Sequence, residues 1–288
     1  MNICIVGLGL LGGSLSLGLK SVYSDIFIRG VETSEENARK ALELGIADQV
    51  VSFETGVRNS ELVILATPVD IMTKQIVEAL DLLQENAILT DLGSTKEKLC
   101  KAADQHPERH RYVAAHPIAG TENSGPDAAF SSLLKHKMMI ICDRENSDPG
   151  AVQRLEDLFR TLEMRIIYMN SIEHDRHIAY VSHLSHISSF ALGSTVLDKE
   201  RDERSIFAMA GSGFSSTVRL AKSSPDMWAP IFSQNQKNVS EALDAYIKKL
   251  QYFKQIIDEN DLSGSYILMK EANEIRRVLQ GLSKGETE

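Results

Sequence analysis

A glycine-rich stretch near the N-terminus constrains the fold more than any other feature of this sequence. The stretch Gly7-Leu8-Gly9-Leu10-Leu11-Gly12 matches G-x-G-x-x-G, directly after the compact apolar run Asn2–Val6 and directly before a helical run. One glycine permits a tight turn, one lets the backbone approach a pyrophosphate, and one lets helix and strand pack closely. The phosphates would lie at the helix N-terminus, where free N–H groups and the helix dipole favour negative charge. The stretch predicts a dinucleotide site at Gly7, Gly9, Leu10, Leu11 and Gly12, with a glycine-rich turn in an ordinary α/β protein as the alternative.

The residue that ends the second predicted strand distinguishes between two cofactors. Glu32 follows Gly12 by 20 residues, where an acid can accept hydrogen bonds from the adenosine ribose hydroxyls and would repel a 2′-phosphate. Arg29 lies three residues earlier, which in an extended strand is the opposite face. We therefore expect NAD as the cofactor, with NADP less favoured. The alternative is that Glu32 is only a solvated charge at a strand end.

Short apolar runs alternate with helical stretches through the first half of the chain. Such alternation is typical of βαβ units and a mostly parallel sheet, and near-continuous apolar strands indicate a sheet covered on both faces. We predict an α/β fold in which residues 1–168 form a Rossmann-type, doubly wound dinucleotide-binding domain. Strands are expected at Asn2–Val6, 25–32, 62–66, 87–91, 112–115 and Met138–Cys142, and helices at 34–44, 69–83 and 95–104.

The pattern changes after about Met169, where strand-like runs stop and helical spacing begins. We predict that residues 169–288 form an all-helical substrate and dimerisation domain. Its apolar stripes are expected to form core or a dimer seam rather than a ligand site. Helical spacing extends over 170–197, 206–221, 226–257 and 265–280.

Charge and composition exclude several classes of protein. The chain has 31 Lys and Arg against 40 Asp and Glu, a formal net charge of −9. An acidic protein is a poor candidate for broad binding of nucleic acid or anionic membranes. No transmembrane segment or signal peptide is apparent. The cysteines Cys4, Cys100 and Cys142 stand far apart without a C-x-x-C pair, which indicates a reducing compartment and a cytoplasmic protein.

Polar residues follow several of the predicted strands. In open α/β sheets ligands bind outside the carboxyl ends of the strands. Thr67 and Pro68 follow the third predicted strand, Ser94 comes after the fourth, and His116 stands at the end of the fifth. Histidine is the usual residue for taking a proton near neutral pH. Ser94 and His116 are therefore expected to point toward a bound nicotinamide; the alternative is that His116 only caps a turn.

Five motifs in a fixed order resemble one enzyme family. They are G-L-G-L-L-G-G-S, T-D-L-G-S-T-K, H-P-I-A-G-T-E, S-H-L-S-H and G-F-S-S-T-V-R-L-A-K-S-S-P-D-M-W. The series resembles the prephenate/arogenate dehydrogenase family of tyrosine biosynthesis, over nearly the whole chain. The second and third motifs together are far more specific than the glycine loop.

The resemblance implies a Rossmann domain followed by a helical domain that forms an intertwined homodimer. It implies an NAD-dependent oxidoreductase that converts prephenate by oxidative decarboxylation to 4-hydroxyphenylpyruvate, CO2 and the reduced cofactor. His116 matches the family's catalytic histidine, which accepts the hydrogen bond of the ring hydroxyl, and Ser94 matches a serine that helps to hold both groups. The implied substrate-binding residues are Arg219, which grips a carboxylate, with His186, Ser182 and His183.

One segment departs from the family pattern. Ser215 and Ser216 stand after G-F, where the family has a basic and an acidic residue. Because this loop borders the substrate site in the resemblance, the choice between prephenate and arogenate stays open. We also expect that a chain of this length has no regulatory domain, so that any feedback by tyrosine acts at the active site itself.

Two pairs of histidines have spacing that could hold a metal on a helix. His174 and His177, like His183 and His186, are three residues apart, but no cluster of Cys or Glu accompanies them. We therefore expect no metal, and a solvated or capping role for His174 and His177. Trp228 is expected to pack the helical domain.

Three other functions compete with prephenate dehydrogenase. Arogenate dehydrogenase would yield tyrosine directly. A β-hydroxyacid or imine reductase shares the two-domain plan, but it would normally supply a catalytic lysine where the helix starting near Ile172 has histidines and serines. A catalytically silent NAD-binding sensor would bind cofactor without turnover, and the retained His116, Ser94 and Arg219 argue against it.

Overall fold

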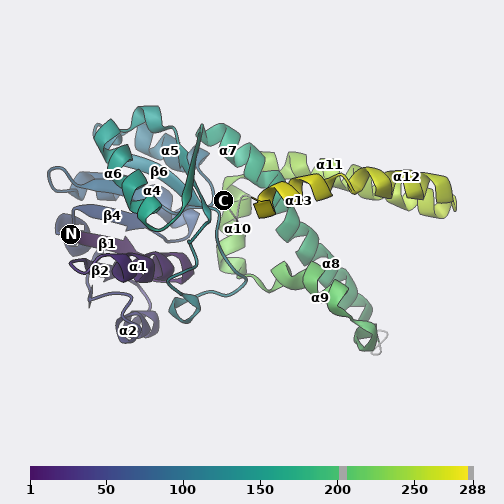
Figure 1. Ribbon diagram of the computed structural model, residues 1–288, viewed down its shortest axis with the longest axis horizontal. Coiled ribbons are helices and arrows are strands. Elements are labelled where there is room, and N and C mark those ends of the chain that lie inside the picture. Colours follow the sequence, from purple (N-terminus) through teal and green to yellow (C-terminus); the bar gives the residue numbers. More distant parts are fainter. Residues whose placement is uncertain (201–205, 285–288) are drawn as a thin grey trace. The chain divides into compact units, whose positions relative to one another are not determined.

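The computed structural model describes residues 1–200 and 206–284 (Figure 1). The chain divides into two compact units, Met1–Gln236 and Lys237–Glu288. The sheet and the helices around it belong to the first unit. None of the described helices has the length and apolar character needed to span a bilayer.

Within the described residues, eight strands form one sheet in the order β3-β2-β1-β4-β5-β6-β7-β8. Neighbouring strands pair in parallel except β6 and β7, which are antiparallel. The reversal of strand order between β1 and β4 is the Rossmann switch point, so the predicted fold class is confirmed. The strands are β1 Asn2–Val6, β2 Phe27–Val31, β3 Gln49–Val50, β4 Leu62–Leu65, β5 Ile88–Asp91, β6 Tyr112–Pro117, β7 Met138–Cys142 and β8 Arg165–Met169.

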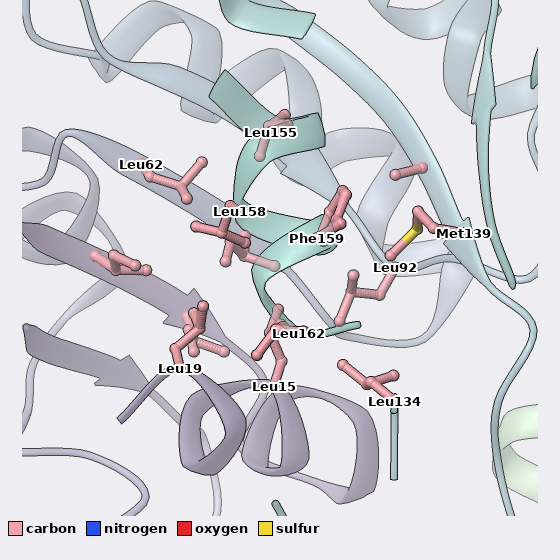
Figure 2. Close-up of a cluster of buried hydrophobic side chains, with 14 of the residues drawn as sticks. Leu15, Leu19, Leu62, Leu92, Leu134, Met139, Leu155, Leu158, Phe159 and Leu162 are labelled. Atoms are coloured by element: carbon pink, nitrogen blue, oxygen red, sulfur yellow. The ribbon is translucent and has the colours of Figure 1, made fainter. Parts of the chain in front are cut away.

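Alternate residues of the central strands enter two separate apolar clusters. Ile3 and Ile5 of β1 belong to one cluster, and Cys4 and Val6 belong to the other, because successive side chains of a strand point to opposite faces. The first cluster is completed by α1 and α6 (Figure 2), and the second by α4 and α5. The sheet is therefore covered on both faces, and the three cysteines are buried free thiols. The helices are α1 Leu10–Val22, α2 Glu35–Glu43, α3 Phe53–Arg58, α4 Val69–Leu82, α5 Glu97–Asp104 and α6 Pro149–Thr161.

The sequence pattern missed four of these elements. Strand β3 has only two residues, and α3 only six, too short for a period to be visible. Strand β8 lies at the sheet edge and is largely exposed, but its sequence R-I-I-Y-M contains four consecutive apolar residues, which were a usable signal. Helix α6 begins with an Asp148 cap and Pro149 at its first position, a start signal that the sequence analysis passed over.

The helical segment after β8 is more broken than predicted. The expected helix 170–197 is α7 Ser171–Ile178, a π-helical stretch Ala179–His183 and α8 Leu184–Glu200. The expected helix 206–221 consists of 3₁₀ turns at Ile206–Met209 and Arg219–Lys222 around α9 Ser212–Val218.

The expected helix 226–257 is wrong as one element. It divides into α10 Pro225–Gln234 and α11 Gln236–Asp258 at Asn235, whose side chain donates a hydrogen bond of 2.6 Å to the Asp175 carbonyl. The expected helix 265–280 also divides, into α12 Leu262–Ala272 and α13 Ile275–Lys284, where Asn273 ends α12.

Candidate active site

The glycine turn between β1 and α1 is shaped by close backbone contacts. Gly7 has a φ of +93°, and a Cβ there would lie 2.7 Å from the Ala66 carbonyl oxygen. A Cβ at Gly12 would lie 2.1 Å from the Gly7 carbonyl oxygen, whereas a Cβ at Gly9 would meet nothing within 4 Å. Gly9 is the N-cap of α1 and offers no side-chain cap. The helix N-terminus, with Leu10 and Leu11 in its first turn, thus has free N–H donors beside open space, which fits a pyrophosphate.

The Glu32 carboxylate is oriented toward this turn by backbone donors. It accepts N–H hydrogen bonds from Leu8 at 3.2 Å, Thr33 at 2.9 Å and Ser34 at 3.1 Å. A carboxylate has about four acceptor positions, so at least one remains for a ribose hydroxyl. The group is placed where a dinucleotide ribose would lie in a fold of this class.

The residues after β4 lie beside the turn. The Thr67 backbone nitrogen would be 3.1 Å from a Cβ at Gly7. The Thr67 hydroxyl donates a hydrogen bond of 2.5 Å to Gln75, and Pro68 is the N-cap of α4. The structure therefore brings these two residues to the same sheet edge as the glycine turn.

His116 is buried near the carboxyl end of β6 and is held at one ring nitrogen. Its Nδ1 lies 2.8 Å from Nε2 of His174, and Nδ1 of His174 lies 2.8 Å from Oδ1 of Asp175. The Asp175 carboxylate also accepts the backbone N–H groups of Lys96 and Glu97 at 2.7 and 3.0 Å. Three side chains from β6 and α7 are thereby joined to the start of α5.

The expected solvated or capping role of His174 is wrong. His174 is 1% exposed and lies against His116. The i, i+3 spacing puts His174 and His177 on neighbouring parts of the helix surface but does not tell which one faces the sheet. His177 is half-exposed and lies 3.8 Å from Glu173, as expected of a surface residue. No group of His, Cys, Asp and Glu with metal-binding geometry occurs among the described residues.

A buried ion pair lies next to the strand segment that contains His116. Lys96 is fully buried, pairs with Asp91 and donates to the Ala115 carbonyl at 2.8 Å. The Tyr112 hydroxyl donates to the second oxygen of Asp91 at 2.6 Å. Both charges are thus compensated, as a buried pair requires. Asp91 and Lys96 both belong to the T-D-L-G-S-T-K motif, and a pair of opposite charges at that strand end was a usable sequence signal.

Burial keeps the site histidines neutral. Desolvation lowers the pKa of His116 well below its usual value, and electrostatic interactions with His174, Lys96 and His183 lower it further. Desolvation also lowers the pKa of His174, although Asp175 opposes the effect. At neutral pH both imidazoles therefore have a lone pair with which to accept a proton.

Ser94 lies half-buried in the turn between β5 and α5. No hydrogen bond joins it to His116 in the described part of the chain; the partner that holds His116 is His174.

Aromatic rings from the π-helical stretch, α8 and α10 form a second part of the site. The rings of His186 and Trp228 stack with centroids 3.6 Å apart, and His186 Nδ1 lies 3.0 Å from the Ser182 carbonyl. His183 is fully buried with its edge toward Trp228, and burial lowers its pKa to about 4. Neither His183 Nε2 nor Trp228 Nε1 has a hydrogen-bond partner among the described residues. Trp228 is buried against Val69 and Ile231, as expected of a packing residue.

Arg219 is half-exposed and donates from one terminal nitrogen to Glu122 at 2.7 Å. Glu122 is the acid of the H-P-I-A-G-T-E motif, so the bond joins two of the quoted motifs. The guanidinium has five N–H donors, and among the described residues only the bond to Glu122 engages them, which leaves donors that could hold a carboxylate.

Known proteins match this chain over nearly its whole length. The family model "Prephenate dehydrogenase, nucleotide-binding domain" matches residues 15–168, and "Prephenate dehydrogenase, dimerization domain" matches residues 170–271. The prephenate dehydrogenase of Bacillus subtilis is 32% identical over 99% of this chain and 77% of its own length. The cyclohexadienyl dehydrogenase of Zymomonas mobilis is 30% identical over 97% of this chain and 96% of its own.

A solved structure is also similar. The prephenate dehydrogenase of Aquifex aeolicus, in complex with hydroxyphenyl propionate and NAD+, is 30% identical. The matched region covers 97% of this chain and 98% of the Aquifex chain, with a TM-score of 0.88. The resemblance inferred from the five motifs is therefore confirmed.

Proposed function

Since the chain belongs to the prephenate dehydrogenase family, we propose that it catalyses the NAD-dependent oxidative decarboxylation of prephenate to 4-hydroxyphenylpyruvate. The observation that carries the proposal is the position and protonation state of the His116 ring. It is a buried, neutral imidazole at the carboxyl edge of the sheet, held at Nδ1, and within the described residues Nε2 makes no hydrogen bond to the protein.

The cofactor site is formed by the glycine turn and its neighbours. Gly9 and the first turn of α1 would hold the pyrophosphate, and Glu32 would accept the ribose hydroxyls and disfavour NADP. Thr67 and Pro68 would contribute to the same site from the end of β4. When bound, NAD supplies one piece of chemistry, which is to accept the hydride from the substrate.

His116 takes the proton of the ring hydroxyl. As hydride leaves the carbon that bears this hydroxyl, the O–H bond breaks, its proton moves to Nε2, and the C–O bond gains carbonyl character. Loss of CO2 then leaves its electron pair in the ring, which becomes aromatic, and the imidazolium returns the proton to the phenolate oxygen. General base catalysis of this kind is worth about 10²–10⁴-fold, and aromatisation makes the reaction effectively irreversible.

The substrate is a dianion, and the protein provides local positive charge. Arg219 holds one carboxylate with the donors that Glu122 leaves free. His186, His183 and Ser182 surround the cyclohexadiene, and the fully buried His183 ring packs against Trp228. Ser94 borders the hydroxyl.

The proposal includes the oligomeric state, the domain boundary, the compartment and the preferred substrate. We infer a homodimer, since residues 170–271 match a dimerization domain, and a domain boundary at 168/169, which the limits of the two family models favour. The buried free thiols favour a reducing compartment such as the cytoplasm. Prephenate is preferred to arogenate in this proposal.

One assay tests the function. Purified protein is given prephenate or arogenate with NAD or NADP, and the reduced nicotinamide is followed by its absorbance. The proposal expects the highest kcat/KM with prephenate and NAD. Absence of turnover with both substrates would leave the NAD-binding sensor as the better account.

A further inference from the structure

The contacts of Asp175 determine which nitrogen of His174 bears a proton. Asp175 already accepts two backbone N–H groups, from Lys96 and Glu97, and its Oδ1 lies 2.8 Å from Nδ1 of His174. A carboxylate in that position is an acceptor, so the hydrogen between it and Nδ1 belongs to His174. A neutral His174 with a proton on Nδ1 has a lone pair on Nε2.

The hydrogen bond between the two rings then determines which nitrogen of His116 bears a proton. Nε2 of His174 lies 2.8 Å from Nδ1 of His116, and a lone pair on the first requires a proton on the second. His116 therefore donates from Nδ1 and keeps its lone pair on Nε2, the nitrogen that faces away from the network. A neutral imidazole of the other tautomer would present an N–H at that position and could not take a proton there.

We propose that His174 and Asp175 are positioning residues which hold His116 as the Nδ1-protonated tautomer and stabilise the imidazolium formed when Nε2 takes the substrate proton. The imidazolium donates a hydrogen bond from Nδ1 to His174, and His174 donates one to the Asp175 carboxylate. The Nδ1 proton stays on His116, and Asp175 stays ionised. The kinetic consequence rests on the proposed function, whereas the tautomer does not.

Packing holds His116, His174 and Asp175, here called the relay, in place. His174 is 1% and Asp175 2% exposed, and the Asp175 main-chain carbonyl accepts from Asn235 at 2.6 Å. The two rings meet edge to face with centroids 5.0 Å apart. A buried network in which each donor has an acceptor has a single low-energy arrangement.

The other titratable groups around the relay are few. Lys96 comes from the turn before α5, Asp91 from β5 and Tyr112 from β6, and these three are bonded together. His183 faces the relay from the π-helical stretch and is kept neutral by burial. The Asp175 carboxylate is thus the anion to which His116 is connected through hydrogen bonds.

The tautomer can be observed directly by NMR of the full-length protein labelled with ¹⁵N-histidine. Long-range ¹⁵N–¹H correlation at neutral pH distinguishes a protonated ring nitrogen from a bare one, and the His116→Asn variant assigns the signals. We expect Nδ1 of His116 to be protonated and Nε2 to be bare. A protonated Nε2 in the free protein would overturn the proposal even if the enzyme turns over prephenate.

Kinetics test the role in catalysis. His174→Phe keeps the ring but removes the acceptor, whereas His174→Gln retains an oxygen that can accept from His116. We expect kcat to fall by about 10- to 100-fold in His174→Phe, part of the about 10²–10⁴-fold that a general base supplies, with little change in either KM and partial recovery in His174→Gln. The acid limb of the pH profile should move to lower pH in His174→Phe, because the imidazolium of His116 loses its acceptor.

The control is His177→Phe, on the same helix but half-exposed, which should behave like the wild type. Wild-type kcat in His174→Phe would refute the positioning role, as would equal losses in the Phe and Gln variants with both KM values raised. If the NMR result holds but no variant or wild type turns over prephenate, the proposed function fails and the tautomer stands.

Discussion

His116 Nδ1 and His174 Nε2 lie 2.8 Å apart, although the two residues are separated by 58 positions in the sequence. The bond joins the tip of β6 to the first helix after the sheet. The His116 ring at the end of a sheet strand is therefore oriented by a residue from the helical segment. Because both rings are buried, their protonation states depend on one another and on Asp175.

The two glycines at the start of α1 should respond differently to a methyl group. Gly12→Ala places a Cβ 2.1 Å from the Gly7 carbonyl oxygen, so we expect a loss of about 1–3 kcal/mol in the free energy of unfolding, as in other overpacked sites. Gly9→Ala meets nothing within 4 Å and should leave Tm unchanged but weaken NAD binding by crowding the pyrophosphate. Thermal unfolding and NAD titration measure the two effects. Tight NAD binding by Gly9→Ala would contradict the site.

Removing the charge of Glu32 should relax the choice of cofactor. Glu32→Gln keeps one oxygen that can accept from Thr33 and Ser34, loses the acceptor for Leu8, and no longer repels a 2′-phosphate. Two like charges about 4 Å apart near a protein surface repel by about 4 kcal/mol, so the ratio of kcat/KM for NAD over NADP should fall roughly tenfold or more. Glu35→Gln, an exposed charge nearby, is the control. A wild-type protein that prefers NADP would overturn the assignment.

Arg219→Gln should affect the substrate rather than the cofactor. A hydrogen bond to a charged group is worth about 1.5–3 kcal/mol, so the KM for prephenate should rise about 10- to 100-fold. The KM for NAD should hardly change. Lys222→Gln removes the same charge from the same turn and should leave both constants as they are. A shift confined to the KM for NAD would rule out contact with a substrate carboxylate.

The buried histidines should make the fold sensitive to acid. Burial lowers the folded-state pKa of His116, His174 and His183, the last to about 4, whereas in the unfolded chain each titrates near its usual value of about 6.5. Above about pH 6.5 both states are neutral and the term vanishes. Below it the unfolded chain takes up protons that the folded one does not, so the free energy of unfolding falls as pH falls, by up to about 1.4 kcal/mol per pH unit for each histidine.

Urea unfolding between pH 7.5 and 5.5 measures this dependence. The His174→Phe variant should show a shallower slope, by the share of one histidine. Equal stability of the wild type at the two pH values would mean that these side chains are not buried in neutral form.

The sequence predicted the parts of this structure that depend on short-range patterns. The glycine turn and the alternation of strands with helices have local periods and fixed spacings, and the structure has both. The partnership of His174 with His116 depends on how α7 docks against α5 and β6, which no local pattern records. For the same reason, the burial of Lys96 against Asp91 and the break of the long helix at Asn235 appeared only in the structure.

The expectation that Ser94 helps to hold His116 shows the same limit of local sequence patterns. Ser94 and His116 were both placed at strand ends, correctly as to the sheet edge. Which side chain holds the imidazole depends on angles and depths that strand order does not specify. The resemblance singled out His116, and the structure adds His174 and Asp175, which hold its ring.

The most direct test of the account is the rate of NADH formation from prephenate by wild type and His116→Asn, with NAD affinity measured on both. The account predicts that kcat falls by about 10²–10⁴-fold in the variant while the Kd for NAD stays the same, since His116 acts on the ring hydroxyl and not on the cofactor. Turnover by His116→Asn at the wild-type rate, or a loss explained by weaker NAD binding alone, would contradict it.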